Sequence, residues 1–410
     1  MSSPAPRYRR LLGRVFVNRD VFFLWSGQVV SQAGDSVFNI GLLWLLLELT
    51  GSNAATGLIA MSAYLPTLLF GLYGGALADR FDRRRLMLAS DLGRALVVAA
   101  IPLLHYKGIL SPALLGLCTF ALATCAVVFV PARDALVGQL APAARLLRAH
   151  SSIQTSWQYA MLLGPAAAGL LVAAFDQIHL FSVDALSYLV SFALIARIRP
   201  GKRAPEQSAG ARVGGQVWEG LRYAWGDRRI RVLLLVTAVD NLFLMGPAIV
   251  GIPIFVRQVL NEGVASYAFA QTAYALGMVA GTLLLNAWGR RTNYGRILLW
   301  GIFFDGITFL PLWWVDTFWG LFVALAVHSA AIPLIVVSRP TLVQRLVPVH
   351  MQGRVFSMIA ICVNGCTAVS VAITGIVSEA VPINVVYAVI AVLAAASGGI
   401  GWLVREFREC

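Results

Sequence analysis

The sequence predicts an all-α integral membrane protein, with twelve transmembrane helices in two pseudo-symmetric bundles of six. Three observations predict this fold class. Of the 410 residues, 59% are hydrophobic and only 12% are charged, whereas soluble domains carry about 25% charged residues. The apolar residues form long runs of membrane-spanning length, and the second half of the chain repeats the first. Since so few charges cannot cover a surface in water, lipid must solvate this protein.

Apolar runs that end at charges or turn residues define the predicted helices in chain order. Each run has about 20 residues or more, the length that crosses the hydrocarbon core. The predicted limits are 21–49, 53–78, 86–106, 109–132, 150–174, 179–197, 230–258, 264–288, 296–315, 317–339, 352–379 and 382–404. An even number of spans places both termini on the same side of the membrane.

The lysines and arginines indicate which side that is. The predicted loops on the side of the termini hold 29 of the 32 basic residues, whereas the opposite loops hold only Lys107 and Arg257, and Arg94 lies within a helix. Basic loops stay in the cytoplasm, so we expect cytoplasmic termini and a multi-pass protein of a prokaryotic cell membrane. The net charge of +13 is then a topology signal and does not indicate nucleic-acid binding.

The two halves of the chain are related by a constant shift of 206 residues. The shift pairs Gly71 with Gly277, Gly75 with Gly281, Arg133 with Arg339, and Asp35 with Asn241. It predicts an N-terminal six-helix bundle at 1–197, a cytoplasmic linker at 198–229 and a C-terminal six-helix bundle at 230–410. Such parallel repeats are typical of secondary transporters, which hold the substrate between the halves near the membrane midplane.

The segment from Gly75 to Arg85, GALADRFDRRR, is the strongest local motif. It resembles the loop 2–3 signature of the major facilitator superfamily, G-x-x-x-D-R-x-G-R-R, with Asp82 in the place of the second glycine. That variation, together with Gly34-Asp35, Gly164-Pro165 and Asp184-Ala-Leu-Ser-Tyr, resembles the macrolide-efflux and siderophore-exporter branch. The resemblance covers nearly the whole chain and implies proton-coupled export of drugs or siderophores.

The resemblance also implies a conformational latch. In the family, the residue that matches Asp79 caps the N-terminus of helix 11 in the outward-open state, where the helix dipole favours negative charge. The signature arginines reach an acid at the end of helix 4, for which Asp134 is the candidate. The expected latch residues are Gly75, Asp79, Arg80, Asp82, Arg83, Arg84 and Asp134. The alternative is that these basic residues only set the topology.

Small residues predict close helix packing at two places. Gly71/Gly75 and Gly277/Gly281 are small-xxx-small pairs on the predicted helices 2 and 8, and such pairs let helix backbones approach closely. Gly164, Pro165 and Gly169 resemble the helix 5 antiporter motif, G-P-x-x-G-G, with Ala168 in place of one glycine. The alternative for this motif is packing without any bearing on coupling.

Polar residues inside a membrane are candidates for function. Gln28, Gln32, Asp35 and Asn39 are spaced 4, 3 and 4 residues apart, which places them on one helical face, with Asp35 about 21 Å from the start of its helix. Because desolvation favours the protonated carboxyl group, Asp35 is the first candidate for proton coupling. Asp240 and Asp305 are the next candidates, and the alternative for each acid is a structural hydrogen bond.

Other polar residues are candidates for a cavity that takes amphipathic molecules. With Gln28, Gln32 and Asn39, this set comprises Gln154, Trp157, Gln158, Asn241, Asn364 and Thr367.

Asp91 and Arg94, three residues apart, are expected to form an ion pair. Asp184 is expected to be associated with the outer end of its helix.

The remaining sequence predicts no catalytic or cofactor chemistry. There is no P-loop motif, the five histidines lack metal-ligand spacing, and the five cysteines are expected to be free thiols. We therefore expect no enzyme activity, no metal and no cofactor. The predicted function is a monomeric, proton-coupled exporter of amphipathic small molecules that works by alternating access. The alternatives are a facilitator or lipid flippase on the same fold, or a non-transporting receptor or scaffold.

Overall fold

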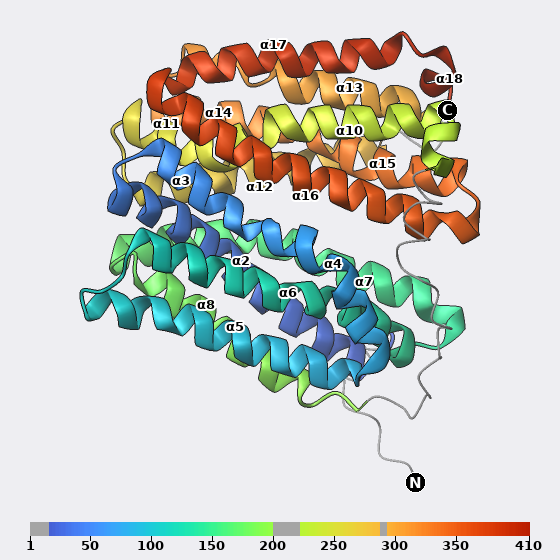
Figure 1. Cartoon of the computed structure of the whole chain (residues 1–410), viewed down its shortest axis with the longest axis horizontal. Helices are drawn as coiled ribbons and strands as arrows, with labels where there is room; N and C mark the ends of the chain where they lie inside the picture. The colour runs from blue at the N-terminus through green and yellow to red at the C-terminus, as the bar shows by residue number, and fades with distance from the viewer. Residues whose placement is uncertain (1–15, 200–221, 288–292) are drawn as a thin grey trace. The chain divides into compact units, whose positions relative to one another are not determined.

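The computed structural model describes residues 16–199, 222–287 and 293–410, and these ranges contain helices and no β-strand. The helices of the first half are α2 (Arg19–Thr50), α3 (Asn53–Ala60), α4 (Leu65–Arg80), α5 (Arg83–Tyr106), α6 (Pro112–Leu140), α7 (Leu146–Ala174) and α8 (His179–Ile195). Those of the second half are α10 (Arg228–Gly246), α11 (Ile252–Gln258), α12 (Val264–Ala287), α13 (Tyr294–Ile307), α14 (Phe318–Ser329), α15 (Ile332–Leu346), α16 (Val349–Ala380), α17 (Ile383–Trp402) and α18 (Arg405–Arg408). Figure 1 shows their course.

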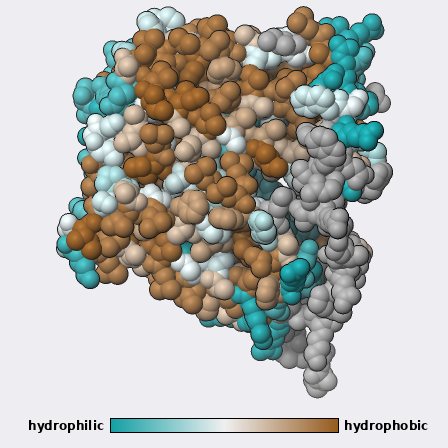
Figure 2. All heavy atoms as spheres, viewed as in Figure 1, coloured by the Kyte–Doolittle hydropathy of each residue, from teal (hydrophilic) through white to brown (hydrophobic). Residues whose placement is uncertain are grey.

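The predicted helical membrane fold is confirmed. Within the described ranges, 10 helical segments are long and apolar enough to cross a membrane, and His179–Ile195 and Ile383–Gly399 are shorter apolar helices. Together they correspond to the twelve predicted spans. Figure 2 shows hydrophobic side chains over the middle of the helices and hydrophilic ones toward their ends. Leucines such as Leu96, Leu170 and Leu284 are about two-thirds exposed, as expected of a surface in contact with lipid.

Two predicted helix ends are wrong. The helices predicted to end at residues 132 and 339 continue to Leu140 and Leu346. Hydropathy ends a span at its first charges, but the backbone hydrogen bonds of a helix do not depend on apolar side chains. Arg133, Asp134 and Arg339 therefore lie within helices, although the sequence predicts the first two in a loop and Arg339 at a helix end.

Short polar side chains begin many of the helices. Ser52, Asp82, Ser111 and Asp227 each accept a hydrogen bond from a backbone N–H of the helix that follows. These N–H groups have no partner within the helix, so a capping side chain stabilises the helix end.

Three of the spans are interrupted. A 3₁₀ turn at Met61–Ala63 separates α3 from α4, a π-helical turn at Pro247–Gly251 separates α10 from α11, and residues 330–331 separate α14 from α15. A proline lies at or just after each break, because its ring removes one N–H from the helical ladder. Broken helices within a membrane are typical of places where transporters bind ions or substrates.

Contacts divide the chain into two units. Unit 1 comprises 1–42 and 69–209, and unit 2 comprises 43–68 and 210–410. In unit 1, α5 packs against α6 and α8, and in unit 2, α10 packs against α16 and α13 against α17. Unit 2 thus includes the end of α2 and all of α3, which the sequence predicts in the N-terminal bundle. Most of the predicted linker, 200–221, lies outside the described residues.

Candidate functional site

Buried polar groups gather in two places, one in each unit. The N-terminal cluster comprises Asp35, Asp91, Arg94, Asp184 and Tyr188, and the C-terminal cluster comprises Asp240, Asp305, His328 and Arg339. In the described part of the chain, ten buried side-chain atoms have no hydrogen-bonding protein partner, and nine of them belong to these clusters or to serines and threonines on the same helices, namely Ser191, Thr237 and Ser338. Since folded proteins keep few such atoms, these two places are the candidate sites for a transported ion or polar group.

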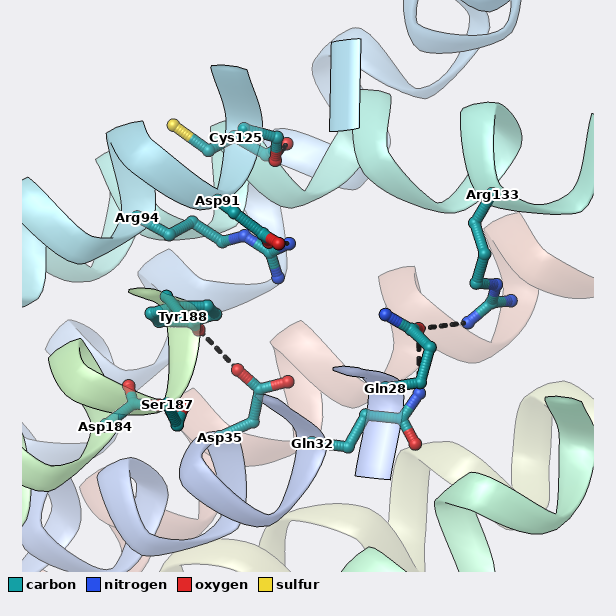
Figure 3. A network of polar contacts seen from close by, with 11 residues as sticks. Gln28, Gln32, Asp35, Asp91, Arg94, Cys125, Arg133, Asp184, Ser187 and Tyr188 are labelled. Atoms are coloured by element: carbon teal, nitrogen blue, oxygen red, sulfur yellow. Dashed lines mark hydrogen bonds and ion pairs between the residues drawn. The ribbon is translucent and has the colours of Figure 1, made fainter. Parts of the chain in front are cut away.

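Tyrosine and arginine side chains organise the N-terminal cluster (Figure 3). The hydroxyl group of Tyr188 on α8 donates a hydrogen bond to the carboxylate of Asp35 on α2. On α5, Nη2 of Arg94 lies 2.5 Å from Oδ1 of Asp91, as the sequence predicts for this pair. The guanidinium of Arg94 also lies 4.2 Å from the ring centre of Phe129 and 4.6 Å from that of Tyr188. These aromatic faces stabilise the buried cation.

Asp184 is a full member of this cluster. The sequence predicts a group associated with the helix end, but its side chain is completely buried. Ser187 donates a hydrogen bond of 3.2 Å to its Oδ1. A Cβ atom at position 34 would overlap the Asp184 and Ser187 side chains, so Gly34 is what lets α2 lie against this acid.

The charges of the N-terminal cluster do not balance. Asp91, Asp184 and Arg94 are buried and Asp35 is half-buried, so three carboxyl groups share one guanidinium. Full ionisation would leave two uncompensated negative charges, and uncompensated charge in an apolar interior is strongly unfavourable. The arrangement therefore favours at least one bound proton, and it can take up or release protons as its surroundings change.

The other polar residues of α2 extend from Asp35 in both directions. Gln28 is buried and its Oε1 accepts hydrogen bonds from Gln32 and from Nη1 of Arg133, each at 3.2 Å. Toward the other end of α2, the amide of Asn39 donates to the backbone oxygen of Asp35 at 2.8 Å. Asn39 is exposed and Asp35 half-buried, so Asp35 lies where a polar helix face meets the buried cluster.

The C-terminal cluster joins four helices. Nη2 of Arg339 on α15 lies 3.2 Å from Oδ2 of Asp240 on α10. Nε2 of His328 on α14 lies 3.5 Å from Oδ1 of Asp305 on α13. The side chain of Asn241 instead donates to the backbone oxygen of Thr237 on its own helix, at 2.8 Å.

The remaining cavity candidates belong to different units. On α7 in unit 1, Gln154, Trp157 and Gln158 are exposed. On α16 in unit 2, Thr367 is buried, and Asn364 is half-buried and donates to the backbone oxygen of Ala360. Their shared role as a substrate cavity remains a prediction.

The signature segment ties helix ends of unit 1 together. Asp82 caps α5 by accepting a hydrogen bond of 2.7 Å from the N–H of Arg85. Arg83 donates to the backbone oxygen of Ala135 on α6 at 3.3 Å, and Arg84 donates to the backbone oxygens at the end of α8. Asp134 pairs with its neighbour Arg133 at 2.8 Å. Asp79 and Arg80 are exposed on the last turn of α4, and capping of helix 11 by Asp79 stays a prediction.

Three of the predicted packing glycines lie in close contacts. A Cβ atom at Gly164 would lie 2.9 Å from the backbone oxygen of Ala33 on α2, and one at Gly277 or Gly281 would overlap the end of α14. Pro165 and Gly169 are buried beside Gly164. Apart from the neighbouring residues of its own helix, no described residue lies within 4 Å of a Cβ built on Gly71 or Gly75.

Comparison with a protein family decides what kind of protein carries these clusters. Residues 16–409 match the family described as "Transmembrane secretion effector", a family of the major facilitator superfamily. The chain belongs to this family. It is a multi-pass membrane transporter of the superfamily and not an enzyme.

Relatives of this transporter include efflux proteins. Macrolide efflux protein A of Streptococcus pyogenes is 22% identical over 88% of this chain and 90% of the relative. The uncharacterized MFS-type transporter YfiS of Bacillus subtilis is 26% identical over 94% and 93%. The multidrug efflux pump Tap of Mycobacterium tuberculosis is 30% identical over 53% and 55%.

Solved transporter structures share the fold. The POT family transporter PepTSo superposes with a TM-score of 0.74 at 12% identity, covering 95% of this chain and 98% of that one. A bacterial homologue of the human lysosomal transporter Spinster gives a TM-score of 0.68 at 15% identity, covering 99% and 97%.

Sequence reasoning missed two members of the transporter's polar clusters. Tyr188 lies four residues after Asp184, a spacing that places both on one helical face, and this signal is visible in the sequence. His328 shows no such pattern, because Asp305, its partner, lies on another helix.

Proposed function

We propose that this transporter exports amphipathic small molecules in exchange for protons, by alternating access, and that Asp35 is the first proton carrier. The excess of carboxyl groups in the N-terminal cluster carries this proposal. A cluster that holds one guanidinium for three carboxyl groups needs a proton to approach neutrality. Export coupled to proton entry needs a group that binds a proton in one state and releases it in another.

Asp35 suits this role better than the other two acids of the cluster. Asp91 is paired with Arg94 and Asp184 with Ser187, and both are buried. Asp35 is half-buried on the polar face of α2, with Gln28 and Gln32 before it and the exposed Asn39 after it. A proton on Asp35 can therefore exchange with a polar path, whereas Asp184 is buried and its polar neighbours on α8, Ser187 and Tyr188, are buried as well.

The substrate class is proposed from two observations. Relatives are named for efflux of macrolides and of multiple drugs. The exposed face of α7 combines Gln154 and Gln158 with Trp157, which is 41% exposed, and such a mixture suits molecules with both apolar and polar surfaces. We propose that these residues of α7 contact the substrate.

Alternating access requires a contact that opens, and we propose one between α3 and α16 in unit 2. A Cβ atom at Gly375 would lie 2.6 Å from the backbone oxygen of Asn53 and 2.8 Å from the Cα of Gly57. The amide of Asn53 donates to the backbone oxygen of Ser378 at 2.8 Å. The carboxylate of Glu379 accepts hydrogen bonds from Oγ of Ser52 at 3.1 Å and from the N–H of Ala54 at 3.0 Å.

With the termini in the cytoplasm, this contact lies on the outer side of the membrane. We propose that it is the closed outer gate and that it separates when the substrate leaves. Because the helix dipole and the free N–H groups of α3 attract the Glu379 carboxylate, the closed gate has an electrostatic component besides the glycine packing.

Proton flux in proteoliposomes tests the proposed function. The purified transporter would be reconstituted as a monomer with a pH-sensitive dye inside, and a panel of dyes, macrolides and siderophores would be added in turn. A proton-coupled exporter moves protons in response to its substrate and concentrates that substrate when a proton gradient is imposed. Substrate movement that is never accompanied by proton movement would identify a facilitator or a lipid flippase instead.

A further inference from the structure

The histidine of the C-terminal cluster occupies an unusual position. His328 is buried on the last turn of α14, and the break before α15 follows within two residues. Its ring stacks on Phe309 at a centroid distance of 3.9 Å, and the ring of Tyr274 on α12 lies 6.0 Å away.

The hydrogen bonds of Thr308 determine the tautomer of the ring. The hydroxyl group of Thr308 donates its hydrogen to the backbone oxygen of Phe304. Its oxygen lies 3.0 Å from Nδ1 of His328. Since the hydroxyl hydrogen is already used, the oxygen accepts a hydrogen bond from Nδ1, which therefore carries a proton.

A ring with its hydrogen on Nδ1 presents a bare Nε2 to Asp305. Nε2 lies 3.5 Å from Oδ1 of Asp305, and two lone pairs at that distance repel each other unless a hydrogen lies between them. One proton, held by nitrogen as imidazolium or by oxygen as carboxylic acid, converts the repulsion into a hydrogen bond. The geometry thus provides a place for one exchangeable proton.

The neighbouring charges set how many protons the cluster holds. Arg339 pairs with Asp240 at 3.2 Å, so this pair is neutral and leaves Asp305 as the uncompensated acid. The other titratable groups around the ring are Tyr274 on α12 and Tyr387 on α17. The ring of Tyr387 is tilted against Phe309 at a centroid distance of 5.2 Å, and its hydroxyl group donates to the backbone oxygen of Pro247. With one proton between His328 and Asp305, the cluster is neutral.

We propose that His328 and Asp305 form a second proton-binding site, in the C-terminal unit, with Arg339 and Asp240 as the charge pair beside it. On uptake, a proton from water forms a bond to Nε2 of His328 and hydrogen-bonds to Oδ1 of Asp305. On release, that N–H bond breaks and the proton returns to water. Its use in transport rests on the proposed proton coupling, but the binding itself requires neither substrate nor gradient.

Nitrogen NMR of histidine tests this site in the full-length transporter. The protein, labelled with ¹⁵N at its histidines, would be titrated between about pH 5 and 8, where imidazole ordinarily changes charge. We expect Nδ1 of His328 to be protonated throughout and Nε2 to gain a proton as the pH falls. Asp305→Asn keeps the shape but removes the acid, and should weaken proton binding by His328 about tenfold or more.

The control is Asp316→Asn, which removes an exposed acid from the segment just before α14 and should leave the titration unchanged. The His328→Gln variant lacks the nitrogen signals of this histidine, and their loss from the spectrum identifies them. If that variant does not fold, a variant that keeps His328 and replaces the other four histidines gives the same signal directly. A ring protonated at Nε2 but not at Nδ1, or an Asp305→Asn variant with unaltered titration, would overturn the proposal.

Failure of this site is distinguishable from failure of the proposed function. If His328 titrates as described but substrate never moves protons in proteoliposomes, the site stands and proton-coupled export is wrong. If substrate moves protons but His328 does not titrate, export stands and this site is wrong.

Discussion

Arg94 is the cation on which the N-terminal cluster depends. It pairs with Asp91 and lies against the rings of Phe129 and Tyr188. The pair is buried on both sides, with side-chain exposures of 6% for Arg94 and 0% for Asp91. Removal of one partner of a buried ion pair leaves the other charge uncompensated.

Arg94→Gln should therefore destabilise the folded transporter by about 3–5 kcal/mol. The second change Asp91→Asn removes the orphaned acid, so the double variant should recover part of that loss. Thermal unfolding of the purified variants measures both effects. The control is Arg405→Gln, whose ion pair with Glu409 is largely exposed and should contribute little. A double variant that is no more stable than Arg94→Gln would show that Asp91 is not the partner.

At the residue scale, the sequence predicts what lies along one helix better than what lies between helices. The Asp91–Arg94 pair is predictable because both residues lie on one helix, three positions apart. The roles of Asp184 and His328 are not predictable in this way. Asp184 lies against α2 because position 34 is a glycine, and the partner of His328 is Asp305 on α13. No spacing within a single helix contains that information.

At the scale of elements, the positions of the spans follow from hydropathy, but their ends do not. Helices α6 and α15 each continue past an arginine, Arg133 or Arg339, which the sequence predicts to lie just beyond the span or at its last position. As a consequence, Arg133 and Arg339 reach back to the candidate residues Gln28 and Asp240 on the first helix of their own half. The 206-residue repeat relates these two arginines, so the repeat preserves the arginine on the helix and changes its partner.

The proposed outer gate predicts that a substitution at Glu379 changes how often α3 and α16 separate. Glu379→Ala removes the acceptor at the start of α3, so the gate should open more often. In a variant without the native cysteines, a cysteine placed at Ser378, which is 5% exposed, should then react faster with a membrane-impermeant reagent from outside. Glu379→Gln keeps one acceptor oxygen and should have a smaller effect.

The control for the gate is Glu262→Ala. Glu262 is also exposed and also accepts a hydrogen bond near a helix start. Its donor is Ser266, at 2.9 Å and on the helix that directly follows it, α12. It should leave the reaction at position 378 unchanged. Equal rates in the Glu379 and Glu262 variants, with both folded, would refute the gate.

At the scale of the whole molecule, the two halves carry related folds but different chemistry. The N-terminal cluster draws its acids from α2, α5 and α8, whereas the C-terminal cluster draws its titratable groups from α10, α13 and α14. Each cluster has one arginine and more acids than the arginine can neutralise. If both clusters bind protons as proposed, their unequal composition lets them respond differently in the two states of an alternating-access cycle.

The substitution Asp35→Asn distinguishes a role of Asp35 in proton coupling from a purely structural role. The amide keeps the shape of the side chain and a hydrogen-bonding oxygen for Tyr188, but it fixes the site as neutral, like the protonated acid. Exchange of labelled for unlabelled substrate requires no net proton movement, so it should survive. Asp240→Asn is the internal comparison, and the two changes can be non-additive if the acids share one proton cycle.

The most direct measurement is therefore proton-driven accumulation of substrate in proteoliposomes by Asp35→Asn and by the unaltered transporter, with exchange measured in parallel. We expect Asp35→Asn to lose net uphill transport, to retain exchange, and to show a flattened dependence of substrate binding on pH. An Asp35→Asn protein that still concentrates substrate against its gradient at the unaltered rate would contradict a coupling role for Asp35, and Asp240 and Asp305 would then be the acids to test.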